Sequence, residues 1–235
     1  MEHPFTEIGS ARGSRSPLSL FPETVFATDG WAFERRAQAQ GARRVAGVDE
    51  AGRGPLAGPV VAAAVILEPD ADLPGLADSK RLTPQQREAL FPQIYQQARG
   101  VGVGVVDVDV IDRINILQAA LQAMQEALAA LPEPPDWVLV DGPHPLPLLG
   151  LPQTPVVRGD ARSASVAAAS IVAKVTRDQI MVRLDALFPG YGLAQHKGYP
   201  TPAHLQQLAA LGPSPVHRLS FAPVRQAFQA RLRSA

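Results

Sequence analysis

The side chains with the clearest potential for chemistry are acids that follow short apolar runs. Four of them stand at or just after such runs: Asp49, Glu50, Asp141 and Asp160. Acids at the ends of neighbouring strands can converge on one edge of a sheet, where their charges raise each other's pKa unless a cation neutralises them. The chain has no cysteine, and carboxylate oxygens favour Mg²⁺ or Mn²⁺. Two such ions about 3.5–4 Å apart would clamp the attacking and leaving oxygens of a phosphodiester displacement.

Each acid also has an ordinary structural interpretation, as a helix cap or a turn residue. Asp160 stands shortly before Ser163 and Ser165, where such a role is common. Neighbouring residues of a regular strand point to opposite faces. Asp49 and Glu50 can therefore share a site only if the strand ends or bends between them, which the glycines that follow would permit. Residue types and spacing alone leave both interpretations open.

The elements that must position these acids alternate between strand-like and helix-like patterns. Continuous apolar runs of strand length occupy residues 44–48, 60–67, 101–106, 137–140 and 155–157. Helical patterns occupy residues 31–40, 114–131 and 165–187, and a further helix opens at Thr83. Thr83 and Gln86 are typical of a capping box. Pro92 is expected to kink or shorten that helix.

This alternation predicts one α/β domain, a mixed sheet flanked by helices, over residues 43–190. Residues 1–42 form an N-terminal extension that we expect to be partly disordered with a short helix, because Ser, Gly, Pro and Arg dominate its first part without periodicity. Residues 191–235 form a helical or irregular C-terminal segment, which we expect to be basic and to bind substrate.

Charge is distributed unevenly, although the formal net charge is zero. No Asp or Glu follows Asp185, whereas that part of the chain contains Lys197, Arg218, Arg225, Arg231 and Arg233. This asymmetry indicates a polyanionic ligand, or else a tail that only increases solubility. No run of about 18 apolar residues is present, so we expect no membrane partner and a cytoplasmic location.

A series of motifs extends over about residues 43 to 222. The first is the run VAGVDEAGRGPLAGPV at residues 45–60. The others are at residues 78–82, 111–115, 140–142, 159–163, 168–178, 196–201 and 217–221. Together, and in this order, these motifs resemble the ribonuclease HII family. The resemblance implies a ribonuclease H-like fold and a centre holding Mn²⁺ or Mg²⁺, with two ions expected, on Asp49, Glu50, Asp141 and Asp160.

The implied activity is that of a metal-dependent endoribonuclease acting as a monomer. Members of the family hydrolyse the RNA strand of RNA–DNA hybrids and nick duplex DNA 5′ to a single embedded ribonucleotide. The products of two-metal catalysis would carry 3′-hydroxyl and 5′-phosphate ends. The partners implied are therefore RNA–DNA hybrid and ribonucleotide-containing duplex DNA.

The resemblance also implies substrate contacts by Gly52, Arg53, Gly54, Lys80, Ser170, Lys174 and Tyr199. The Gly-Arg-Gly loop would sense the 2′-hydroxyl, the group that separates RNA from DNA. Tyr199 would stack near the sugar past the cut, and Lys80, Ser170 and Lys174 would contact phosphates. Without the resemblance, the loop is a tight turn, Tyr199 is a core or surface aromatic, and Ser170 is a packing residue.

Three other functions remain open at this point. A non-catalytic nucleic-acid-binding module would use the basic C-terminus with an inactive site, but all four acids are present. A related nuclease on the same fold, such as ribonuclease HIII or a DNA resolvase, is less compatible with the loop at residues 52–54. A small-molecule phosphatase would not need a basic C-terminus.

Overall fold

The structure is a computed structural model that describes residues 29–69, 71–76, 82–147 and 149–234. The expected disorder at the start of the chain and the expected phosphate contact of Lys80 lie outside these residues. In the described part, no helix is both long and apolar enough to cross a membrane.

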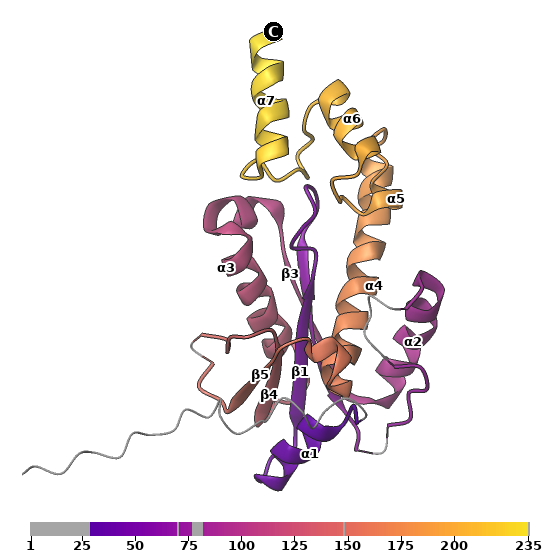
Figure 1. Cartoon of the computed structure of the whole chain (residues 1–235), viewed down its shortest axis with the longest axis vertical. Helices are drawn as coiled ribbons and strands as arrows, with labels where there is room; N and C mark the ends of the chain where they lie inside the picture. Colours follow the sequence, from indigo (N-terminus) through magenta and orange to yellow (C-terminus); the bar gives the residue numbers. More distant parts are fainter. Residues whose placement is uncertain (1–28, 70, 77–81, 148, 235) are drawn as a thin grey trace, which may run out of the picture.

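A five-stranded mixed sheet forms the centre of the molecule (Figure 1). Its strands are β1 (Val45–Ala51), β2 (Val60–Leu67), β3 (Ala98–Val106), β4 (Trp137–Asp141) and β5 (Gln153–Val156), in the order β3-β2-β1-β4-β5. The pairs β1–β2 and β2–β3 are antiparallel, whereas β1–β4 and β4–β5 are parallel. The parallel strands β1, β4 and β5 therefore end at the same edge of the sheet.

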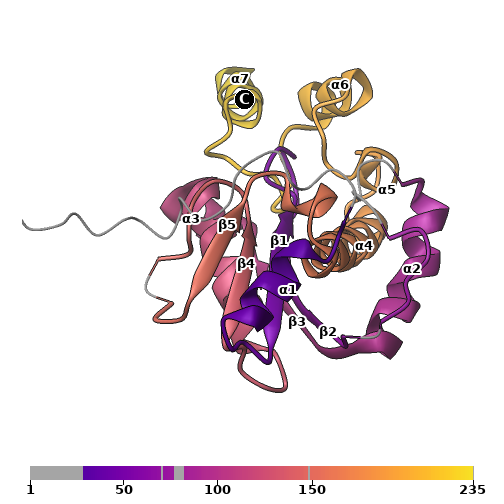
Figure 2. The same cartoon turned by 60° about the horizontal axis from the view of Figure 1, so that its bottom comes forward.

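Helices cover both faces of the sheet (Figure 2). The described helices are α1 (Ala32–Ala39), α2 (Pro84–Gln97), α3 (Val108–Ala129), the 3₁₀ turn η3 (Gly159–Ala161), α4 (Ala164–Leu187), α5 (Leu193–His196), α6 (Pro202–Leu211) and α7 (Ala222–Ser234). Helix α3 packs on one face, and α2 and α4 pack on the other. This is the α/β architecture that the alternating pattern predicts.

Strand β2 lies between the two cores and is buried along its whole length. Ala62, Ala64 and Ile66 face the core beneath α3. Ala63 and Val65 face the core beneath α4. This alternation follows from the two-residue period of a strand, and burial of both faces explains why the sequence of β2 is a continuous apolar run.

The structure differs from the expectations about two element ends. Pro92 does not shorten helix α2, which continues past it to Gln97. Pro92 and Glu88, whose carbonyl loses its helical partner, are both exposed, so water can satisfy that carbonyl. Strand β1 also continues beyond Asp49 and Glu50 to Ala51, because β2 pairs with it over its whole end.

Candidate active site

A cleft of about 270 Å³ opens where β1 and β4 end beside α4. It is lined by Asp49, Glu50, Ala51, Gly52, Arg53, Gly54, Arg87, Asp141, Ser170, Lys174 and Tyr199. Three of the four expected metal ligands and six of the seven expected substrate contacts therefore line one cavity. These residues come from β1, the loop after it, α2, β4, α4 and the segment before α6.

Asp49 and Glu50 both line the cleft although β1 does not end between them, so the expectation that sharing a site requires such a break is wrong. Their partners in β2 are Ala63 and Ala62, so the antiparallel ladder holds both residues in place. The parallel ladder with β4 ends at the pair of Val48 with Val140, which leaves the other edge of β1 open at Asp49. The backbone N–H of Glu50 donates to Asp49 Oδ1 at 2.7 Å, and Glu50 Oε1 accepts from Arg53 at 3.1 Å.

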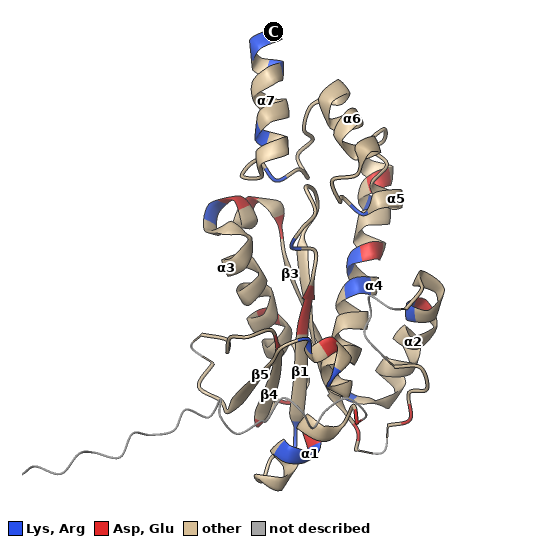
Figure 3. Cartoon of the chain, viewed as in Figure 1, with Lys and Arg blue, Asp and Glu red and all other residues tan. Residues whose placement is uncertain are grey.

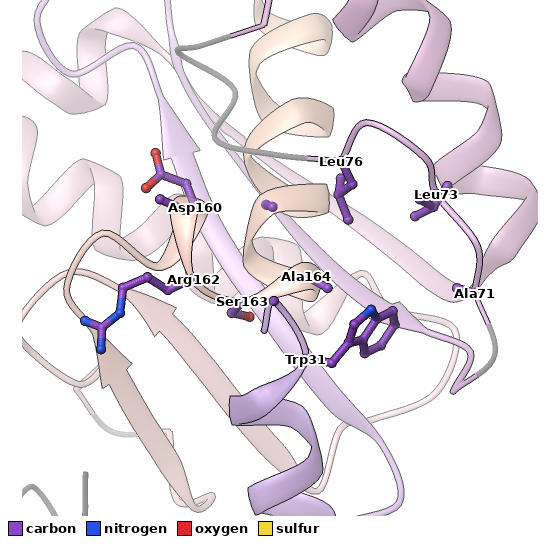
Figure 4. A pocket seen from close by; sticks show the side chains of 11 residues that line it. Trp31, Ala71, Leu73, Leu76, Asp160, Arg162, Ser163 and Ala164 are labelled. Carbon is purple, nitrogen blue, oxygen red and sulfur yellow. The ribbon is translucent and has the colours of Figure 1, made fainter. Parts of the chain in front are cut away.

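Asp141 ends β4, and Asp160 lies in the turn η3 after β5. Asp141 Oδ1 accepts a 2.7 Å hydrogen bond from the backbone N–H of Gly159. That bond joins the end of β4 to the turn that carries Asp160. The side chain of Asp160 is buried and lines a second cavity of about 250 Å³. Figure 4 shows Trp31 and Asp160 among the residues that line this second cavity, with the Asp160 carboxylate pointing away from Trp31.

The start of α4 is tied down next to Asp160 by a buried acid on α1. Glu34 Oε1 accepts from Ser163 Oγ at 2.6 Å, from Ser165 Oγ at 2.6 Å and from the backbone N–H of Ser165 at 2.9 Å. Ser163 is also the N-cap of α4, where its hydroxyl accepts from Val166 N. Ser163 thus has a capping role at the start of α4, close to Asp160 in the chain.

The other three acids are close enough to Asp49 to alter its protonation. Burial raises the pKa of Asp49 well above its usual value, and the negative charges of Glu50, Asp141 and Asp160 raise it further. The hydrogen bond from the Glu50 amide opposes this effect. A cation placed among these groups would lower the pKa of Asp49 by reversing the sign of the local field.

The donor chemistry of this cluster fits a hard divalent cation, because every candidate ligand is a carboxylate oxygen. Among the described residues, no three carboxylate or imidazole side chains are already gathered as a metal-binding group. Like charges favour separated carboxylates until a cation draws them together. The carboxylates are thus of the kind that Mg²⁺ or Mn²⁺ prefers, and the raised pKa of Asp49 reflects first its burial and then the neighbouring negative charges.

The six described residues among the expected substrate contacts line the same cleft as Asp49, Glu50 and Asp141. Tyr199 is 41% exposed, and its ring lies 3.6 Å from where a Cβ on Gly54 would be. Lys174 Nζ lies 5.9 Å from the centre of the Tyr199 ring and donates to Asp178 at 2.7 Å. Ser170 is one helical turn before Lys174 on α4 and is buried at the base of the cleft. The loop, the tyrosine and α4 thus form a continuous wall.

Two arginines that sequence reasoning did not assign to the site are part of its framework. Arg177 and Arg218 are 1% and 0% exposed, and both donate to backbone carbonyls of the loop at residues 52–59. Arg218 was counted with the basic C-terminus, and burial excludes it from a surface that contacts nucleic acid. Arg87 also lines the cleft without having been expected there. Long-range contacts of this kind leave no periodic pattern in a sequence.

The three histidines near the C-terminus contact one another, and His204 and His217 are buried. His196 stacks on His204 with ring centres 4.2 Å apart, and His204 Nε2 lies 3.1 Å from His217 Nε2. Burial lowers the pKa of His204, and it lowers that of His217 to about 4. Backbone and serine groups contact the other ring nitrogens of His204 and His217. These contacts give the three side chains a structural role.

Comparison with known proteins assigns the chain to a family. The family model described as ribonuclease HII matches residues 46–224. Ribonuclease HII of Geobacter sulfurreducens is 59% identical over 83% of this chain and 90% of its own length. Ribonuclease HII of Syntrophotalea carbinolica is 56% identical over 89% of this chain and 99% of its own.

A solved structure is also similar. The crystal structure of ribonuclease H2 from Pyrococcus horikoshii superposes with a TM-score of 0.68 at 29% identity, and the match covers 82% of this chain and all of that one. The matched family segment includes all four acids of the cluster and every described residue of the expected substrate contacts. The chain therefore belongs to the ribonuclease HII family and is a nuclease of the hydrolase class.

Proposed function

We propose that this protein is a metal-dependent endoribonuclease that nicks duplex DNA 5′ to a single embedded ribonucleotide and cuts the RNA strand of RNA–DNA hybrids. Its products would carry 3′-hydroxyl and 5′-phosphate ends, and it would act as a monomer. The observation that supports this most strongly is the presence of three acids and the Gly-Arg-Gly loop in one cleft. A site for hydrolysis and a candidate sensor of the sugar are thereby adjacent.

Asp49, Glu50, Asp141 and Asp160 are the residues that would hold the Mg²⁺ or Mn²⁺ ions. Bound ions would supply a nucleophilic water at neutral pH and would stabilise charge on the leaving oxygen. Asp141 is already fixed by its hydrogen bond from Gly159, and Asp49 by its hydrogen bond from Glu50. Such bonds orient ligand carboxylates before an ion binds and so reduce the cost of assembling the site.

The loop at residues 52–54 would recognise the ribose through its backbone. Gly54 has no side chain to keep a sugar away, so N–H groups of the loop can approach a 2′-hydroxyl, whereas the carbonyl groups of Gly52 and Arg53 face Arg218. The ion pair of Arg53 with Glu50 links this loop to the acids. A ribose held by the loop would therefore bring its phosphate to the carboxylates. A deoxyribose would lack the contact between a 2′-hydroxyl and the loop.

The remaining wall of the cleft would hold the strand on either side of the cut. Tyr199 presents a half-exposed ring beside Gly54, where it can stack on the sugar after the scissile phosphate. Lys174 and Ser170 project from consecutive turns of α4 and can contact phosphates. Phosphate contacts fix the register of a nucleic acid without reading its sequence. Specificity would thus depend on the sugar.

The test is a single gel with a labelled DNA duplex that contains one ribonucleotide. The protein should cut it with Mg²⁺ or Mn²⁺ and not with EDTA, and end mapping should place the nick on the 5′ side of the ribonucleotide. Binding without cleavage under any metal would contradict the proposal and favour a non-catalytic module. Cutting of long hybrids alone would contradict recognition of single ribonucleotides.

A further inference from the structure

The loop between β1 and β2 is held by a buried guanidinium. Its carbonyl groups turn inward, and Arg218 donates to those of Gly52, Arg53, Pro55 and Gly58 at 2.7–3.1 Å. Gly58 accepts twice, so the five hydrogen bonds use all five N–H donors of the side chain. Arg218 lies 160 residues or more along the chain from these partners, and it is completely buried.

A second buried guanidinium holds the other end of the same loop. Arg177 on α4 donates to Pro59 O at 2.9 Å and to Ala57 O at 3.1 Å. Its remaining nitrogen donates to Lys197 O at 3.0 Å, two residues before Tyr199. Arg177 therefore connects three parts of the cleft wall: the helix that carries Lys174, the loop, and the segment that carries the tyrosine.

The loop packs closely against Arg177, so a substitution of this arginine would change the position of the loop backbone. Gly52 has a φ of +100°, and a Cβ added to it would lie 2.1 Å from Arg177 Nε. Backbone bonds complete the enclosure, because Leu56 N donates to Gly198 O and Arg218 N donates to Leu56 O. The conformation of the Gly-Arg-Gly segment is thus set by contacts on its inner side.

Stability alone is a poor reason for these two charges to be buried. Neither guanidinium forms a salt bridge within the described part of the chain, and burying a charge without a counterion is unfavourable. Burial lowers the pKa of Arg177 to about 10 and that of Arg218 to about 9, so both stay charged at neutral pH. Charged donors form the stronger hydrogen bonds to carbonyl groups, and the planar fork fixes their directions.

We propose that Arg177 and Arg218 are positioning residues for sugar recognition, which hold the loop at residues 52–59 in the one conformation that can accept a ribose beside the acids. The inference rests on the proposed function, because it assumes that this loop contacts the 2′-hydroxyl. Neither arginine touches substrate. Their effect on catalysis passes through the backbone of Gly52 and Arg53.

The experiment compares Arg177→Lys and Arg218→Lys with the wild type and with a control, Arg183→Lys. Arg183 lies on α4 and is exposed, so its replacement keeps the charge and disturbs no buried contact. Amide hydrogen exchange of peptides spanning residues 50–60 measures the loop directly. Single-turnover cleavage of a duplex with one ribonucleotide measures recognition, and affinity for an all-DNA duplex measures general binding. Circular dichroism confirms folding.

Each lysine variant should raise exchange in the loop about tenfold or more, because charged hydrogen bonds to its carbonyls are lost. Cleavage should fall about 10²-fold, because small displacements of reacting groups have effects of that size. Affinity for all-DNA duplex and exchange in β2 should stay within about threefold of the wild type. A purely structural role would leave cleavage by the folded variants unchanged well below their melting temperatures.

Unchanged loop exchange in a folded lysine variant would overturn the proposal, as would faster exchange with full cleavage. If a variant does not fold, the wild type still provides a test: its Leu56 and Gly58 amides must exchange as slowly as those of β2, and fast exchange would overturn the proposal. Wild-type protein that cuts no embedded ribonucleotide would contradict the proposed function instead. The exchange data would then still report whether the arginines hold the loop.

Discussion

At the scale of single residues, the main feature of the cleft is a group of carboxylates that lie close together, of which Asp49 is buried. Asp49 is 5% exposed, and this burial raises its pKa. The negative charges of the three other acids raise it further. The sequence was sufficient to single out these acids as candidates, because each follows an apolar run and matches a family motif. It was not sufficient to identify Arg218, which has the same residue type as the exposed arginines around it.

Replacement of Asp141 tests the role of this charge. Asp141→Asn keeps the size of the side chain, and its oxygen can still accept from Gly159, but it removes one negative charge from the cluster. We expect cleavage of a single-ribonucleotide duplex to fall by about 10²–10³-fold or more under saturating Mg²⁺. Affinity for hybrid, measured by fluorescence anisotropy, should change little. An Asp141→Asn protein that cuts within a few-fold of the wild type would exclude Asp141 as a metal ligand.

At the scale of elements, the site depends on how closely α4 approaches β1. A Cβ added to Gly47 would lie 2.2 Å from the backbone carbon of Ser165, so strand and helix pack backbone to backbone there. This approach brings Ser170 and Lys174 to the same cleft as Asp49. Apolar patterns predicted both elements. They could not predict that β1 continues to Ala51, since that extension depends on pairing with β2.

Substitution of Gly47 by alanine should therefore destabilise the fold more than the same change elsewhere in the sheet. Backbone atoms of Ser165 cannot move aside as a flexible side chain can, so Gly47→Ala should reduce the free energy of unfolding by about 3 kcal/mol. Gly100→Ala in β3 is the matched control, because the nearest atoms to its Cβ would be side-chain atoms, of Pro132 at 3.0 Å and of Leu131 at 3.5 Å. It should stay within about 1 kcal/mol of the wild type. Equal urea midpoints for the two variants would contradict this view of the interface.

At the scale of the whole molecule, the C-terminal part has two roles that the sequence merges. Arg218 holds the loop at residues 52–59. Helix α7, in contrast, projects from the sheet and has basic but no acidic residues (Figure 3). Asp112 on α3 joins the two parts by accepting from the backbone N–H groups of Leu219 and Ser220. A truncation at residue 215 would therefore remove Arg218 as well as α7. The uneven distribution of charge was visible in the sequence. The sequence did not show that Arg218 holds the loop while α7 presents the other basic side chains.

Point substitutions on α7 separate the two roles. Arg225 and Arg233 are exposed, and their joint replacement by Gln leaves Val224, which packs under the helix, in place. If both contact phosphates, the slope of log affinity against log salt concentration should become shallower by about 1.8 units, or about 0.9 for each contact. Cleavage at saturating protein should not change. A slope equal to that of the wild type would mean that α7 serves only solubility.

The central claim is that the sugar decides whether the acids can act on a phosphodiester that RNA and DNA share. Its most direct measurement is the single-turnover rate of the wild type, with Mn²⁺, on three duplexes that differ at one nucleotide: ribose, 2′-deoxyribose and 2′-O-methylribose. We predict rapid cutting of the first and no detectable cutting of the other two, with similar affinities for all three, since phosphate contacts dominate binding. Comparable cutting of the all-DNA duplex would contradict recognition of the ribose by the loop at residues 52–54.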